Sequence, residues 1–352
     1  MIVLNPEDLL PSVYMTLNQL APSWEGLELG IGDATLLKTI GNTTGRSMAQ
    51  LKADMERLGD VGIIAEQSKS SQRTMFQVKN YVNKIRKNNF ILLSKKIICC
   101  NASISYQFQP APLTVAAVFT RLREVATMTG SSSSVKKTDK IQSLLVACRG
   151  CEARYLVRSL AGKLRIGLAE QSVLQALAQA CLQTPLLQSE YPPSVLTAFK
   201  TADSDTFKEK LAPLALKLKT AYCECPSYDL LIPALLESGI DKLKEKCKIT
   251  PGIPMKPMLA HPTKGIQEVL TRFENLKFTC EWKYDGERAQ VHMHEDGTIN
   301  IYSRNQEDNT TKYPDVIARF ANCMSENVKS FVLDSEAVAW DRETKIIQPF
   351  QV

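Results

Sequence analysis

One short run of the 352-residue sequence carries the residues best suited to chemistry. It contains Lys283, Asp285, Gly286 and Arg288, in the order Lys-x-Asp-Gly-x-Arg. A lysine amine is a nucleophile only when neutral, and removing its proton at neutral pH costs about 4.6 kcal/mol. Burial or a neighbouring cation such as Arg288 lowers that cost. The pattern is typical of covalent catalysis on a phosphorus or carbonyl centre, although ordinary hairpins with a solvated lysine also contain it.

Strands must position these side chains. The pattern of residues 278–283, a short run bounded by the Asp-Gly turn signal, predicts a strand that ends at that turn. Because side chains alternate along a strand, Glu281 and Lys283 are expected on one face. Arg288 opens the next strand, and the turn would bring it back towards Lys283.

Two later strands each deliver a polar residue near the strand end. Residues 299–305 read Ile-Asn-Ile-Tyr-Ser-Arg-Asn, and residues 331–338 read Phe-Val-Leu-Asp-Ser-Glu-Ala-Val. Together with the lysine run, they resemble motifs of the covalent nucleotidyltransferases, which include ATP-dependent DNA ligases and mRNA capping enzymes. The longer run 302–310 is similar to the eukaryotic ATP-dependent DNA ligase I family specifically.

The resemblance implies a multidomain fold. An all-α DNA-binding domain is expected over residues 1–247, a linker over 248–262, and the first part of an α+β (ATP-grasp-like) nucleotidyltransferase domain over 263–352. Relative to the family, we expect the first helices of the helical domain and the OB-fold domain to be absent. Also expected to be absent are the aromatic residue that stacks on adenine, a second metal-binding carboxylate and a lysine pair for the α-phosphate. This chain alone would then label itself with AMP weakly at most.

The same resemblance assigns roles to the site residues. Lys283 would attack the α-phosphorus of ATP, and the AMP would pass to the 5′-phosphate of a nick, which the 3′-hydroxyl then seals. Glu281 would accept a hydrogen bond from the adenine amino group. Arg288 and Arg304 would bind phosphate and ribose oxygens, a task that suits the planar arginine fork. Glu336 would bind ribose or Mg²⁺.

Other interpretations of these residues remain open. Glu281 could form a salt bridge with a lysine, and Glu336 could belong to a surface ion pair. Asn305 is a candidate DNA contact. A second hypothesis is a non-catalytic fragment that binds DNA through its helical domain, which DNA binding without adenylation would identify. The large helical region before Lys283 argues against a capping enzyme.

A loop bounded by two glycines, residues 162–167, is the first candidate for contact with DNA. Glycine lets a backbone approach a phosphate closely, and the helix that follows offers free amide donors. Gly162, Lys163, Arg165 and Gly167 are therefore candidate DNA-binding residues, with both cations expected to point outward. An isolated pattern of this kind is more often an ordinary interhelical turn, but the ligase resemblance places this loop on the minor groove beside the nick.

A small polar loop is a second, weaker candidate for DNA contact. It runs from Gly130 into two lysines, and its candidate contacts are Ser131, Lys136 and Lys137. A single helix is expected to follow, over residues 138–160.

Residues 78–109 do not fit the family pattern. This window contains six of the 43 basic residues and no acid, and the remaining 37 basic residues equal the acids in number. The net charge of +6 therefore arises in the window, and global charge gives no argument for nucleic-acid binding. The edges of the window can be encoded as splice-site-like sequences. A translated retained intron is one hypothesis, and a basic DNA-binding loop is the other; sequencing the transcript distinguishes them.

Composition limits the other function classes. Ten irregularly spaced cysteines predict a reducing compartment, and the pair Cys148 and Cys151 is expected inside a helix. His292 and His294 share a strand face, but no third metal ligand is evident. No uninterrupted apolar stretch is long enough to span a membrane. The resemblance implies nicked double-stranded DNA as partner, ATP and Mg²⁺ as cofactors, a monomer in the nucleus, and a sliding clamp bound through an amino-terminal region of the family.

Overall fold

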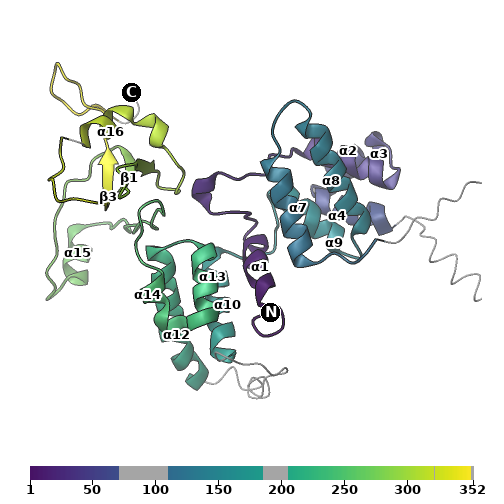
Figure 1. The fold of residues 1–352 in the computed structure, drawn as a ribbon, viewed down its shortest axis with the longest axis horizontal. Coiled ribbons are helices and arrows are strands. Elements are labelled where there is room, and N and C mark those ends of the chain that lie inside the picture. Colours follow the sequence, from purple (N-terminus) through teal and green to yellow (C-terminus); the bar gives the residue numbers. More distant parts are fainter. Residues whose placement is uncertain (71–109, 185–204, 321, 350–352) are drawn as a thin grey trace, which may run out of the picture. The chain divides into compact units, whose positions relative to one another are not determined.

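The computed structural model describes residues 1–70, 110–184, 205–320 and 322–349. These residues form two compact units, one of residues 28–168 and one of residues 1–27 together with 169–352 (Figure 1). The anomalous window 78–109 lies outside the described residues.

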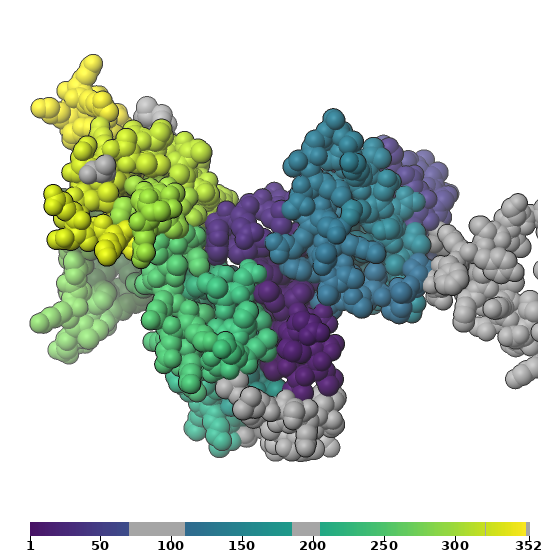
Figure 2. Space-filling model, viewed as in Figure 1, coloured from purple at the N-terminus to yellow at the C-terminus, as the bar shows by residue number. Residues whose placement is uncertain are grey.

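The first unit contains only helices in its described part, and these helices pack into one compact unit, drawn purple-blue and teal in the space-filling view (Figure 2). Local sequence signals set its helix ends. Ser47 and Gln50 form a capping box at the start of α3, and Gly59 ends that helix with a left-handed φ of 61°. Its helices are α2 (Asp33–Thr44), α3 (Met48–Leu58), α4 (Val61–Ser70), α7 (Val115–Thr127), α8 (Ser133–Ala147) and α9 (Glu152–Leu160).

The expectation of one helix over residues 138–160 is wrong. The chain forms α8 and α9 instead, and Cys148 and Cys151 flank the break rather than lying inside a helix. Gly150 takes a left-handed φ of 51°, which an α-helix does not permit. The Glu152 carboxylate, on the first residue of α9, accepts a hydrogen bond from the Arg149 amide at 2.6 Å and so stabilises the turn between the two helices.

The second unit begins with a group of helices that pack around three tyrosines. The Tyr14 and Tyr228 rings meet edge to face at 5.7 Å, and Tyr222 stacks on Tyr228 at 4.7 Å. The helices are η1 (Pro6–Asp8), α1 (Leu9–Thr16), η2 (Ser23–Glu25), α10 (Glu170–Gln183), α12 (Asp205–Glu224), α13 (Tyr228–Ser238), η4 (Ile240–Lys242) and α14 (Leu243–Lys246).

A three-stranded antiparallel sheet follows, in the order β2-β1-β3. Its strands are β1 (Glu287–Met293), β2 (Ile299–Tyr302) and β3 (Phe331–Ala337), as expected for the two later strands. The alternating residues Ala289, Val291 and Ile301 form a small core, which α16 (Pro314–Phe320) covers with Val316, Ile317 and Phe320. The remaining elements are α15 (Ile266–Arg272) and η5 (Thr310–Lys312).

The expected strand over residues 278–283 is wrong. These residues lie outside any strand in the part of the chain that the structure describes, and they are exposed. A strand forms only by pairing with another, and residues 278–283 pair with none of the three strands, although the outer edge of β3 carries no partner strand among the described residues. After β3, an isolated bridge pairs Trp340 with Ile347.

No helix within the described ranges is both long enough and apolar enough to cross a bilayer.

Candidate active site and DNA-binding loop

The two faces of the sheet differ in chemistry, because neighbouring residues of β1 point to opposite sides. One face carries the core that α16 covers. The other face is polar. Across β1 and β3 it pairs Arg288 with Glu336 and Gln290 with Asp334 in the antiparallel register. The candidate site residues of the strands therefore lie on one face.

Arg288 is held on this face by a residue that the sequence analysis missed. Its Nε donates to Asp334 Oδ1 at 2.9 Å and its Nη2 donates to Asp334 Oδ2 at 2.5 Å. These hydrogen bonds raise the pKa of Arg288 above its usual value, and the nearby Glu336 carboxylate adds to the shift. The spacing of Asp334 and Glu336, two residues apart on one strand, was the sequence signal for a second acid on this face.

Gly286 explains why the lysine run needs a glycine. A Cβ atom at this position would lie 2.3 Å from the Ala337 carbonyl oxygen, at the end of β3. Only a residue without a side chain lets the turn approach the neighbouring strand this closely. The Asp-Gly pair therefore sets how Arg288 enters the sheet.

Glu287, the first residue of β1, anchors the strand from the other side. Its carboxylate accepts hydrogen bonds from Asn309 Nδ2 at 3.1 Å and from the Tyr313 hydroxyl at 2.8 Å. Burial, together with Glu287, raises the pKa of Tyr313 to about 12. Asn309, within the run 302–310, therefore has a structural role in holding Glu287, a role that the resemblance did not predict.

The Ser-Arg-Asn element forms a tight turn after β2. The Ser303 hydroxyl accepts hydrogen bonds from the amides of Asn305 and Glu307, both at 3.2 Å. The Ser303 amide donates to the Glu307 carbonyl at 2.9 Å. This turn leaves the side chains of Arg304 and Asn305 exposed at its tip, where a ligand can reach them.

Lys283 and Glu281 are not brought to this face. Both are exposed, as is Trp282 between them, which is 87% exposed. The structure thus assembles Arg288, Asp334 and Glu336 on the polar face. Lys283, five residues before Arg288 in the sequence, lies outside the sheet and is exposed.

Part of the predicted linker segment, residues 252–255, docks on the polar face of the sheet. The Gly252 amide donates to His292 Nδ1 at 3.0 Å, and the Met255 amide donates to Gln290 Oε1 at 2.6 Å. The Gln306 side chain donates to the Pro254 carbonyl at 2.5 Å. Main-chain groups of the linker therefore meet side chains of β1 and of the turn after β2.

His292 is neutral in this arrangement. Burial, with a contribution from His294, lowers the pKa of His292 to about 4. Because Nδ1 accepts from Gly252, the ring proton lies on Nε2, which donates to Gln290 Oε1 at 3.0 Å. His292 is thus bound into the linker contact, whereas His294 Nε2 hydrogen-bonds Asn300 Oδ1 at 3.0 Å. The described residues contain no cluster of three or more metal-ligating side chains.

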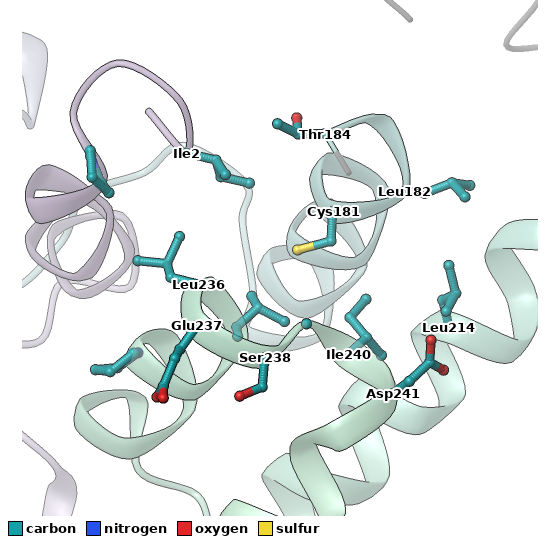
Figure 3. Close-up of a pocket in the computed structure, with 14 residues that line it drawn as sticks. Ile2, Cys181, Leu182, Thr184, Leu214, Leu236, Glu237, Ser238, Ile240 and Asp241 are labelled. Atoms are coloured by element: carbon teal, nitrogen blue, oxygen red, sulfur yellow. The ribbon is translucent and has the colours of Figure 1, made fainter. Parts of the chain in front are cut away.

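A pocket of about 840 Å³ in the second unit is separate from these residues (Figure 3). Cys181, Leu214, Leu236 and Ile240 contribute to an apolar lining between α10, α12 and α13. None of the residues expected to act on nucleotide or DNA lines it.

The 162–167 loop is fixed to α9 by its own backbone. The Gly162 amide donates to the Ser159 carbonyl and the Lys163 amide donates to the Arg158 carbonyl, each at 3.0 Å. Gly162 has a φ of 71°, so these bonds form a Schellman motif. Gly162, Lys163 and the second glycine, Gly167, are all exposed.

Arg165 differs from the expectation that both loop cations point outward. Its guanidinium is half exposed but donates to Asp60 Oδ2 at 3.3 Å and to the Gly59 carbonyl at 3.3 Å. Lys163 is the cation that matches the expectation.

The second candidate DNA contact also differs from its expected setting. The helix α8 begins at Ser133, so Lys136 and Lys137 lie on its first turns rather than in a loop. Ser131 and Lys136 are exposed, whereas Lys137 Nζ donates to the Leu29 carbonyl at 3.3 Å.

Comparison with known proteins places the chain among the ligases. Residues 1–178 match the family described as DNA ligase N terminus, and residues 257–352 match the ATP dependent DNA ligase domain. The chain is 47% identical over 351 residues to DNA ligase 1 of Drosophila melanogaster, covering 100% of the chain and 41% of that protein. It is 42% identical to DNA ligase 1 of Dictyostelium discoideum, covering 100% of the chain and 27% of that protein. It is 40% identical to DNA ligase 1 of Schizosaccharomyces pombe, covering 99% of the chain and 39% of that protein.

Proposed function

The chain belongs to the ATP-dependent DNA ligases, and from this premise we propose that the whole protein seals nicks in duplex DNA through an AMP-lysine at Lys283. The chain spans less than half the length of these three relatives. The observation that carries the proposal is the polar face of the sheet, where Arg288 lies directly opposite Glu336 and five residues after Lys283.

In the first step, the neutral Lys283 amine attacks the α-phosphorus of ATP. A nitrogen–phosphorus bond forms, the bond from the α-phosphorus to the bridging oxygen breaks, pyrophosphate leaves, and the amine proton passes to solvent. The AMP is then transferred to the 5′-phosphate at the nick, which breaks the nitrogen–phosphorus bond. Finally, the 3′-hydroxyl attacks that 5′-phosphorus, and AMP leaves as the strand is sealed.

Arg288 of the polar face, together with Arg304 in the turn after β2 and Glu281 in the lysine segment, supplies positive charge and hydrogen bonds for these steps. Arg288 and Arg304 bind phosphate or ribose oxygens, and Glu281 accepts a hydrogen bond from the adenine amino group. Lys283 is exposed, so nucleotide binding must bring it to this face. Five residues span at most about 18 Å, so Lys283 remains within reach of Arg288.

We propose Mg²⁺ as the metal, with Glu336 as a protein ligand. Mg²⁺ is usually bound through one or two carboxylates together with substrate phosphates, and it neutralises phosphate charge during transfer. The exposed carboxylate of Glu336 fits this pattern, whereas Asp334 is already bonded to Arg288.

For the helical region we propose contact with nicked double-stranded DNA through the 162–167 loop and the start of α8. Lys163 and Lys136 are exposed cations that can neutralise phosphates. Asn305 is the proposed DNA contact of the sheet region. We also propose that the whole protein acts as a monomer in the nucleus, in replication, repair and recombination, and that it binds a sliding clamp.

The proposal is tested by incubating the whole protein with ATP labelled at the α-phosphate, followed by denaturing electrophoresis. We expect labelled protein from which pyrophosphate releases ATP, and no label on the Lys283→Arg variant. The variant Lys277→Arg, which alters an exposed lysine outside the motif, serves as the matched control and should label normally. Label that persists in Lys283→Arg would disprove the assignment, and nicked-DNA binding without any label would favour the non-catalytic alternative.

A further inference from the structure

A buried carboxylate lies where the 162–167 loop meets the turn between α3 and α4. Asp60 is 5% exposed. Its Oδ1 accepts hydrogen bonds from the amides of Gly62 at 2.9 Å and Ile63 at 3.2 Å, at the start of α4. Arg158 of α9 donates to Oδ2 from Nε at 3.1 Å and from Nη2 at 2.8 Å. Asp60 therefore connects α4 to the helix that ends in the loop.

The neighbourhood of Asp60 is packed too closely to rearrange easily. A Cβ atom on Gly62 would lie 2.6 Å from the Arg154 carbonyl oxygen and 2.7 Å from Arg158 Cγ. Burial alone would raise the pKa of Asp60, but the Arg158 guanidinium and the two amides outweigh it and hold the pKa below its usual value. The carboxylate is thus a fixed, charged acceptor.

Arg165 uses this fixed acceptor from the loop side. Its backbone is in the left-handed region, with a φ of 54°, which is uncommon for a residue other than glycine. Its guanidinium bridges Asp60 Oδ2 and the Gly59 carbonyl oxygen. A guanidinium has five N–H donors, so the half-exposed side chain keeps further donors for a ligand.

We infer that Asp60 is a positioning residue for DNA binding, which holds Arg165 and the 162–167 loop in the conformation that meets the phosphates. The inference rests on the proposed contact between this loop and nicked DNA. Asp60 itself is buried and touches no DNA. It acts by fixing the direction of the Arg165 fork, so that the loop loses less conformational entropy when a phosphate binds.

The negative charge of Asp60 and its proposed positioning role predict opposite changes in DNA affinity for the substitution Asp60→Asn. Asp60→Asn removes a negative charge beside a cationic loop, so electrostatic attraction alone would tighten DNA binding. If Asp60 positions Arg165, the same substitution weakens binding, because the amide replaces a charged acceptor with a neutral one. Whether the affinity for DNA rises or falls therefore distinguishes the purely electrostatic effect from the positioning role.

The experiment is fluorescence anisotropy with the 352-residue chain and a labelled nicked duplex, at about 0.1 M salt. We expect Asp60→Asn to weaken binding about two- to fivefold. The matched control is Glu56→Gln, which removes one charge from an exposed site on α3 and should leave affinity unchanged or slightly higher. Thermal melting of each variant verifies that it is folded at the assay temperature.

A second variant keeps the test valid if Asp60→Asn melts too low. Arg165→Lys retains the charge but cannot bridge Asp60 and the Gly59 carbonyl with a planar fork, so it should also weaken binding about two- to fivefold. The inference would be overturned if folded Asp60→Asn bound as tightly as Glu56→Gln, or if Arg165→Lys bound like the unchanged chain. Either result would leave the proposed DNA contact of the loop standing. Absence of binding by the unchanged chain would overturn both the inference and the proposed DNA contact.

Discussion

The Arg288 guanidinium meets the Asp334 carboxylate with two parallel hydrogen bonds, of 2.9 and 2.5 Å, from strand β1 to strand β3. This bidentate geometry orients an arginine more firmly than a single contact does. It leaves Arg288 fixed beside Glu336, its partner in the strand register.

We predict that Asp334→Asn slows formation of AMP-lysine in the whole protein about three- to tenfold, because Arg288 loses its orientation when one partner becomes neutral. Rates of label transfer at several ATP concentrations would measure the effect, and we expect KM for ATP to rise. Asp315→Asn, at an exposed position on α16, is the control. A rate equal to that of the unchanged protein would contradict the prediction.

Gly286→Ala should destabilise the sheet. The added Cβ would lie 2.3 Å from the Ala337 carbonyl oxygen, so the turn or the end of β3 must move. We expect a loss of about 1–3 kcal/mol in the free energy of unfolding, measured by urea denaturation. Gly265→Ala adds a Cβ with no heavy atom within 4 Å and should be nearly neutral. Equal effects of the two substitutions would argue against the close contact.

Stability should fall in mild acid because of His292. Its pKa is lowered to about 4 in the folded protein by burial, against an ordinary value of 6.5. The unfolded chain therefore binds a proton first, and the stabilisation present above pH 6.5 is lost as the pH falls from 6.5 towards 4. The loss amounts to at most roughly 3 kcal/mol.

Urea denaturation at a series of pH values measures this loss. Substituting His292 with Gln should flatten the curve between pH 6.5 and 4, whereas His261→Gln, at an exposed position, should leave it unchanged. A His292→Gln curve as steep as that of the unchanged chain would assign the acid sensitivity to other groups.

Lys69 should stabilise the helical unit by capping α8. Its Nζ donates to the Val146 carbonyl at 3.0 Å and also to the carbonyls of Leu145 and Cys148, at the carboxyl end of that helix. We expect Lys69→Met to lower the free energy of unfolding by about 1–2 kcal/mol. Lys52→Met, at an exposed position on α3, should change little by the same denaturation assay.

The sequence predicted best where a local signal and a periodic pattern agreed. The strands at residues 299 and 331 and the helix that follows the 162–167 loop formed where the sequence predicted them. The single break between Cys148 and Cys151 was missed because the apolar spacing continues through it; in the structure, Gly150 takes the left-handed conformation there.

Residues whose roles depend on distant partners could not be read from the sequence. Asp60 and Arg165 are far apart in the chain, and nothing in either segment indicates that they pair. Residues 278–283 have strand-like composition, but a strand also needs another strand that pairs with it. Local patterns cannot tell whether one exists.

The contact between the linker and the sheet constrains amino-acid identity more strongly on β1 than at Met255 of the linker. Its amides at Gly252 and Met255 are recognised by side chains of β1, so the sheet reads peptide groups rather than linker side chains. Apart from proline, which has no N–H to donate, many residues could replace Met255 without loss of recognition. Sequence drift should therefore be tolerated at that linker position and opposed at Gln290 and His292.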